Sequence, residues 1–118
     1  EFFIWILKNI IRRPRPISLN ALASESSFSF PSGHAFIAIS FYFLLIYFYY
    51  LESKNKIWKI SSIIFGLLLV TGIGFSRIYL GVHWLTDVLA SYFFGFIWII
   101  ILILMFRNKL KLEDDVKK

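Results

Sequence analysis

The sequence contains no cysteine, so the chain can form neither a disulfide nor a thiolate metal site. That absence leaves the redox compartment open. Gly/Ser-rich linkers, internal repeats and low-complexity runs are also missing, and 118 residues suffice for one domain. Charge is absent from two long stretches, residues 36–51 and 88–106. A soluble domain of this size could not bury so much apolar sequence, so the chain is predicted to lie in a membrane.

Hydrophobic and basic residues are in excess. Hydrophobic residues make up 58% of the chain, aromatic residues make up 20%, and the net charge is +6. A basic excess is typical of proteins that bind nucleic acid or an anionic lipid surface. The apolar segments favour the lipid surface, so we expect the bilayer as a partner and no nucleic acid.

Three apolar runs each supply about 20 residues, or roughly 30 Å of helix, which is enough to cross the hydrocarbon layer. Residues 1–11 are apolar apart from Lys8 and Asn9 but are too short to span alone. They fit the end of a preceding spanning helix and an interfacial amphipathic segment equally well. Because open backbone is not tolerated in lipid, we predict an all-α integral membrane protein, an antiparallel helix bundle. Its spanning helices cover about residues 32–51, 57–75 and 86–106, after the C-terminal end of a preceding helix at about 1–11.

The chain is predicted to form one membrane domain over residues 1–118, ending in a polar tail at 107–118. Residues 12–31 form a basic, serine-rich loop, in which a short helix is compatible with residues 19–24. The sequence starts abruptly in apolar residues, and we expect it to be a fragment of a longer membrane protein. Small residues could allow close contacts between helices at Gly66, Gly72, Gly74, Ser91 and Gly95.

Basic residues predict how the bundle lies in the membrane. The number of spans places the loop before His34 and the connection at 76–87 on one face, and the turn at 52–56 and the tail on the other. Orientation follows the excess of lysine and arginine, which marks the cytoplasmic side. The turn and tail side carries Lys54, Lys56, Lys59, Arg107, Lys109, Lys111, Lys117 and Lys118, against Lys8, Arg12, Arg13, Arg15 and Arg77 on the other. We therefore expect a protein of the cell or cytoplasmic membrane with its tail in the cytoplasm and both loops facing outward.

Polar residues on the outward face form three motifs. The first is K-x6-R-P, from Lys8 to Arg15 and the proline after it. The second is P-S-G-H at residues 31–34. The third is S-R-x5-H-x3-D, from Ser76 to Asp87. Both histidines of the chain lie in these motifs, and polar groups placed where the bilayer makes them costly are usually functional.

The histidines and Asp87 have the residue types needed for phosphoryl transfer. His83 and Asp87 are four residues apart, so on a helix they would share a face. A carboxylate beside one ring nitrogen fixes the tautomer and makes the other nitrogen a better nucleophile. His34, when protonated, could give a proton to a leaving oxygen. Taken alone, a His–Asp pair at this spacing is more often a contact that stabilises a helix.

Cations and a helix end on the same face would bind a phosphate. A helix beginning near Ser32 directs its free N–H groups at the basic loop, and Gly33 lets an oxygen approach the backbone closely. Ser32 and Gly33 fit an ordinary helix cap as well. The cations that would neutralise the phosphate are Lys8, Arg15 and Arg77. Arg12 and Arg13 lie outside the motifs, and for them contact with lipid headgroups is favoured over contact with a second phosphate.

Together, in this order and spacing, the three motifs resemble the type 2 phosphatidic acid phosphatase family, membrane lipid phosphatases related to vanadium haloperoxidases. The resemblance covers residues 8–87, and the hydropathy agrees through residue 106. It implies that His83 attacks phosphorus to form a phosphohistidine, that Asp87 orients His83, and that His34 protonates the leaving group. It implies that the phosphate is held by Lys8, Arg15, Ser32, Gly33 and Arg77, without a metal or a cofactor. Members commonly have six spanning helices, so this chain would be an N-terminally truncated member, about the C-terminal two-thirds of the domain.

The function that this resemblance implies is metal-independent dephosphorylation of a membrane lipid phosphate. Its substrate would be an isoprenoid diphosphate, such as undecaprenyl diphosphate, or a phosphatidic-acid-type glycerolipid phosphate. Two alternatives stay open: transfer of the phosphoryl group to an acceptor other than water, and a non-catalytic membrane protein that binds anionic lipid headgroups.

Overall fold

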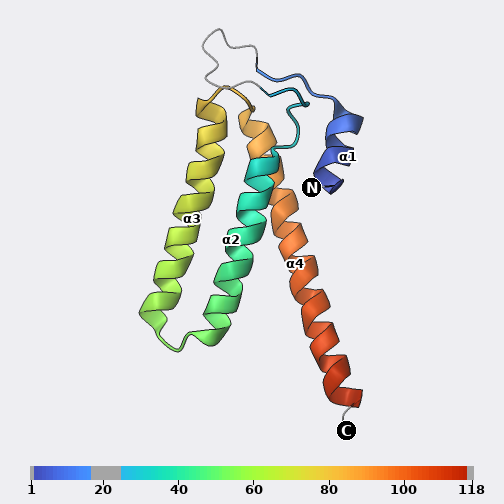
Figure 1. Cartoon of the computed structure of the whole chain (residues 1–118). Helices are drawn as coiled ribbons and strands as arrows, with labels where there is room; N and C mark the ends of the chain where they lie inside the picture. Colours follow the sequence, from blue (N-terminus) through green and yellow to red (C-terminus); the bar gives the residue numbers. More distant parts are fainter. Residues whose placement is uncertain (1, 17–24, 117–118) are drawn as a thin grey trace.

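The computed structural model describes residues 2–16 and 25–116, and the side chains as far as residue 107. Within these ranges all regular secondary structure is helical, without a strand (Figure 1). The helices are α1 (Phe2–Ile11), α2 (Gly33–Glu52), α3 (Lys56–Tyr79) and α4 (Leu85–Val116). All but α1 are long and apolar enough to cross a membrane. The all-α membrane bundle predicted from the sequence is confirmed, whereas the short helix suggested at residues 19–24 falls outside the described residues.

Two helices extend further than the hydropathy predicted. α3 continues past residue 75 to Tyr79, so Ser76 and Arg77 belong to a helix and not to a connection. α4 continues past residue 106 to Val116, so the polar tail begins as helix. Neither extension contains glycine or proline, which disfavour helix. Hydropathy indicates where the lipid ends, whereas the hydrogen bonds of a helix can continue beyond that point. α3 stops just before Gly81, which adopts a left-handed conformation with φ of 71°.

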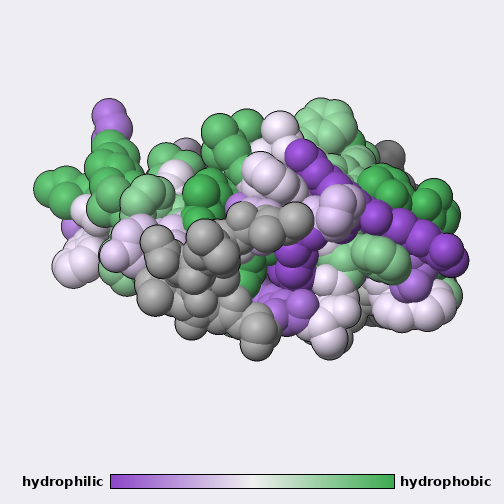
Figure 2. All heavy atoms as spheres, turned by 90° about the horizontal axis from the view of Figure 1, so that it is seen from above, coloured by the Kyte–Doolittle hydropathy of each residue, from purple (hydrophilic) through white to green (hydrophobic). Residues whose placement is uncertain are grey.

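α2 is the central helix, because it packs against both α3 and α4, which contact each other much less. The described parts of the basic loop and the connection between α3 and α4 lie at one end of the bundle, with α1 beside them (Figure 1). The turn between α2 and α3 and the end of α4 lie at the other. The two motif-bearing loops therefore share one end, as the number of spans predicted. This end carries hydrophilic residues between flanking apolar ones (Figure 2).

The core of the bundle is small and depends on close approach of the helices. Ala38, Ile39, Val70 and Ile99 form its centre. A Cβ atom at Gly95 would lie 2.2 Å from Cγ2 of Ile39, so only glycine fits there. Gly66 and Gly74 are similarly confined, and Ser91 is fully buried. The prediction was wrong for Gly72, which has nothing within 4 Å of a Cβ and faces away from the other helices.

Candidate active site

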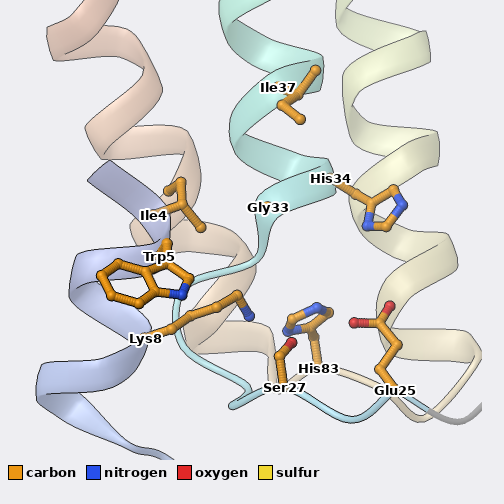
Figure 3. A pocket seen from close by; sticks show the side chains of 9 residues that line it. All are labelled: Ile4, Trp5, Lys8, Glu25, Ser27, Gly33, His34, Ile37 and His83. Carbon is orange, nitrogen blue, oxygen red and sulfur yellow. The ribbon is translucent and has the colours of Figure 1, made fainter. Parts of the chain in front are cut away.

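A cavity of about 330 Å³ opens at the loop end of the bundle (Figure 3). Its walls come from α1, the basic loop, the first turns of α2, and the connection between α3 and α4. The side chains of Lys8, His34 and His83 all point toward this space (Figure 3). The complete lining comprises Ile4, Trp5, Lys8, Glu25, Ser27, Gly33, His34, Ile37 and His83.

His83 lies in the connection before α4, not on the helix. The expectation that His83 and Asp87 share a helix face is therefore wrong, because α4 begins only at Leu85. Asp87 sits in the first turn and reaches back, accepting a hydrogen bond of 2.9 Å from the backbone N–H of Trp84. Nδ1 of His83 is 3.6 Å from Oδ2 of Asp87, just beyond hydrogen-bonding distance. The two groups face each other, and a small movement would join them.

The surroundings of His83 favour the neutral imidazole. The side chain is 1% exposed, and burial lowers its pKa from 6.5 to about 4. This value includes, after burial, the positive charges of Arg15 and Lys8, which also lower the pKa, and the smaller opposing effects of Glu25 and Asp87. Nε2 lies 3.4 Å from Nη1 of Arg15. At neutral pH the ring is therefore uncharged, with one nitrogen toward a cation and the other toward a carboxylate.

Arg15 and Lys8 are held by oxygens of the loops. Nη1 of Arg15 donates to the carbonyl of Val82 at 2.7 Å, and Nε donates to the carbonyl of Ser27 at 2.7 Å. Nη2 donates to Oε2 of Glu25 at 2.6 Å. Nζ of Lys8 donates to the carbonyl of Phe28. These contacts fix the positive charge of Lys8 in the cavity wall and that of Arg15 beside His83.

The start of α2 supplies the other predicted phosphate ligands. Ser32 is the N-cap residue, but its hydroxyl makes no capping hydrogen bond. Its Oγ is buried and has no partner among the described atoms, which is costly unless a ligand or water completes it. A Cβ on Gly33 would meet only Cγ2 of Ile4, at an ordinary 3.9 Å, so packing does not require glycine there. A phosphate oxygen bound directly against the backbone would require glycine at this position.

Arg77 lines a different cavity from the other cations. This second cavity, also about 330 Å³, runs between α2 and α3, and His34 and Ile37 line both. Nε of Arg77 donates to Oγ of Ser76 at 3.3 Å. The structure thus brings Lys8, Gly33, His34 and His83 to one cavity, with Arg15, Ser32 and Asp87 packed around it. Arg77 lines the second cavity, which shares His34 with the first.

Sequence reasoning missed three residues of this region. Arg13, expected at lipid headgroups, instead forms an ion pair of 2.7 Å with Oδ1 of Asp87. Oγ of Ser29 donates to the other carboxylate oxygen of Asp87. Glu25 lines the cavity and pairs with Arg15. The available signals were the second arginine two residues before Arg15 and the fact that Glu25 is the only acidic residue between residues 2 and 51.

No metal-binding group of three or more His, Cys, Asp or Glu side chains occurs within the described ranges. The site consists of a histidine flanked by a carboxylate and cations, at one end of helices long enough to cross a membrane. These features define a helical membrane protein with a buried histidine between a carboxylate and cations at one end of its bundle. Residues 1–111 match the PAP2 superfamily, and the chain belongs to that family.

Three similar proteins and one crystal structure place the chain within the family. The chain is 42% identical over 108 residues to phosphatidylglycerophosphatase B of Bacillus subtilis, covering 90% of this chain and 52% of that protein. It is 31% identical over 128 residues to sphingosine-1-phosphate phosphatase 1 of Rattus norvegicus, covering 95% of this chain and 27% of that protein. It is 35% identical over 70 residues to an undecaprenyl-diphosphatase of Sulfolobus acidocaldarius, covering 59% and 30%.

The crystal structure of a transmembrane PAP2-type phosphatidylglycerolphosphate phosphatase from Bacillus subtilis superposes with a TM-score of 0.80 at 36% identity. The match covers 92% of this chain and 53% of that one. The chain thus spans about half the length of these Bacillus proteins.

Proposed function

We propose that the protein containing this chain removes phosphate from a membrane lipid phosphate through a phosphohistidine formed on His83. The observation that carries the proposal is the placement of the two ring nitrogens. Nε2 faces the cavity 3.4 Å from Arg15, while Nδ1 faces the buried carboxylate of Asp87. The relatives are named for lipid monophosphates and diphosphates, which supports this substrate class.

In the first step, Nε2 of His83 attacks phosphorus, an N–P bond forms and the P–O bond to the lipid breaks. Burial keeps the imidazole neutral, so its lone pair is available. Positive charge that develops on the ring is stabilised by Asp87, whose contact with Nδ1 tightens from 3.6 Å. Lys8 and Arg15 compensate the charge on the phosphoryl oxygens. His34, in its protonated form, gives its proton to the leaving lipid oxygen.

In the second step, water attacks phosphorus and the N–P bond breaks. His34, now neutral, takes a proton from the attacking water, which restores its first state. The electron pair of the N–P bond returns to Nε2, so His83 is regenerated and inorganic phosphate leaves. Ser32 and the N-terminus of α2 offer further donors to the phosphate throughout.

The place of the cavity suits a lipid substrate whose headgroup lies at the membrane surface. The cavity opens at the loop end of the bundle, and apolar side chains of α1 and α2 form part of its wall. A phosphate at this end leaves the lipid tail beside the spanning helices. We further propose that this end faces outward and that the end of α4 lies in the cytoplasm, as the distribution of lysine and arginine indicates.

The test is phosphate release by the full-length protein in detergent with a chelator present. The panel should include phosphatidylglycerophosphate, phosphatidic acid, undecaprenyl diphosphate and sphingosine 1-phosphate. We expect turnover of at least one, lowered at least about 1,000-fold by His83→Ala. When the protein is denatured during turnover without acid, phosphate should stay bound to the unmodified protein and should be absent from His83→Ala. Full turnover by His83→Ala would show that another group is the nucleophile, and tight lipid binding without turnover would favour a non-catalytic lipid-binding protein.

A further inference from the structure

Asp87 is a fully buried carboxylate whose charge is matched by an arginine outside the three motifs. Oδ1 accepts a hydrogen bond of 2.7 Å from Nη1 of Arg13. Oδ2 accepts from Oγ of Ser29 and from the backbone N–H of Trp84. His83 lies beyond hydrogen-bonding distance and is neutral, so it contributes no compensating charge. Because a buried charge without a partner is costly, Arg13 is the group that makes this carboxylate stable here.

Arg13 is itself fixed by the start of α4. Nη1 also donates to Oγ1 of Thr86 at 2.6 Å, and the guanidinium carbon lies 5.5 Å from the ring centre of Trp84. The backbone carbonyl of Arg13 accepts from the N–H of Ser29 at 2.9 Å. Arg13, Ser29 and Asp87 therefore form a closed set of contacts that joins both ends of the basic loop to α4.

We propose that Arg13 is a positioning residue of the phosphatase site, which neutralises the buried Asp87 carboxylate and holds Oδ2 toward Nδ1 of His83. The inference rests on the proposed function. It separates two arginines that stand two residues apart: Arg15 lies on the Nε2 side of His83, where phosphate would bind, and Arg13 lies behind Asp87. Although 34% of its side chain is exposed, Arg13 acts through Asp87 and not on the lipid.

Kinetics of the full-length protein distinguish this role from headgroup binding. Arg13→Gln removes the charge behind Asp87, so we expect kcat to fall about 10- to 100-fold with KM changed less than about threefold. Arg13→Lys keeps the charge but not the forked geometry, and we expect a smaller fall in kcat. Arg12→Gln is the matched control, since Arg12 is exposed and its Nε donates to the carbonyl of Asn9, and it should behave as the unmodified protein. A rise in KM at constant kcat, or unchanged kinetics, for Arg13→Gln would overturn the proposal.

A double-mutant cycle tests whether Arg13 acts through Asp87. In an Asp87→Asn background the carboxylate charge is gone, so Arg13→Gln should lower the residual kcat less than about threefold. If Arg13→Gln lowered kcat by the same factor in the Asp87→Asn background as in the unmodified protein, Arg13 would be acting independently of Asp87. The positioning role would then be wrong.

Titration of His83 gives a readout that needs no turnover. In ¹⁵N-histidine spectra each ring gives two nitrogen signals, and the pair of signals that is missing from His83→Gln belongs to His83. The charged groups that face His83 are Arg15, Lys8, Glu25 and Asp87. Without Arg13, the charge of Asp87 is uncompensated and favours the imidazolium, so the pKa of His83 should rise in Arg13→Gln. If no lipid phosphate is turned over, the proposed function fails while this titration still tests Arg13, and an unchanged pKa would refute its role.

Discussion

Oε2 of Glu25 lies 2.6 Å from Nη2 of Arg15, in the wall of the cavity that His83 faces. The Glu25 carboxylate points toward His34 across this space (Figure 3). The Glu25 carboxylate accepts from a donor of Arg15 that a phosphate oxygen could use, and it brings a negative charge to the proposed phosphate site. A lipid phosphate entering the cavity must either displace Glu25 or bind next to it.

Glu25→Gln should therefore strengthen substrate binding. Removing the competing charge frees Arg15, and since a partly exposed ion pair contributes up to about 1 kcal/mol, we expect KM to fall about fivefold. kcat should stay within about twofold, because the contacts of His83 with Asp87 are untouched. Initial-rate kinetics at low ionic strength measure both constants, with Glu52→Gln at the opposite end of the bundle as the control. A higher KM would mean that Glu25 instead holds Arg15 in its binding position.

The pKa of His83 predicts activity well into the acid range. The nucleophile proposed above is the neutral imidazole, which dominates above about pH 4 in the folded protein instead of above 6.5. As the pH is lowered, kcat/KM should fall with a midpoint near pH 4 to 5, where His83 becomes protonated. The measurement needs a substrate whose phosphate does not titrate in that range. A midpoint at 6.5 or above would show that His83 is not desolvated as its burial implies.

The same pKa predicts how stability depends on pH. The pKa of His83 is 6.5 when unfolded and about 4 when folded, so between these values the unfolded chain binds more protons. The contribution of neutral His83 to the free energy of unfolding is therefore complete above pH 6.5 and is lost as the pH falls toward 4. The melting midpoint in detergent should drop over this window more for the unmodified protein than for His83→Gln. Equal pH dependence of the two would contradict the folded-state value.

The fold was readable from the sequence because the membrane imposes simple rules on it. The charge-free runs at 36–51 and 88–106 predicted two helices and their approximate positions, and counting spans placed both motif loops at one end. Hydropathy could not show that α3 includes Arg77 or that α4 reaches Val116, because helix hydrogen bonds continue beyond the lipid. It also gave no means of telling Gly72, which packs against nothing, from Gly95.

The site was predicted less completely, because motif spacing gives residue types but not partners. Of the residues chosen from the motifs, Lys8, His34 and His83 line one cavity. Motif spacing also suggested a shared helix face for His83 and Asp87, whereas the helix begins between them. The partner of Asp87 is Arg13, which is 74 residues away along the chain, so no local pattern could reveal it. Similarly, Arg77 stands in the expected motif but lines the neighbouring cavity.

The role proposed for His34 predicts a dependence on the leaving group. A proton donor matters most when the departing oxygen is strongly basic, as in a lipid alcohol. We expect His34→Ala to lower kcat about 100- to 1,000-fold with a lipid monophosphate but less than about tenfold with an aryl phosphate, whose phenolate leaves without a proton. Phosphate release from matched alkyl and aryl substrates measures this difference. His83→Ala is the control, since loss of the nucleophile should affect both substrates alike, and equal losses in His34→Ala would exclude the proton-donor role.

Close packing of α4 on α2 should depend on the missing side chain at Gly95. A Cβ there would meet Cγ2 of Ile39 at 2.2 Å and the backbone carbonyl oxygen of Phe36 at 3.3 Å, so the helices must separate. We expect Gly95→Ala to destabilise the protein by about 1 to 3 kcal/mol, lowering its melting midpoint in detergent. Gly72→Ala is the matched control, because a Cβ there meets nothing within 4 Å and alanine favours helix by up to about 1 kcal/mol. Since α2 begins at Gly33 beside the cavity, displacement of α2 by Gly95→Ala should also lower kcat. Equal midpoints for the two variants would show that α2 and α4 do not pack as closely as this contact requires.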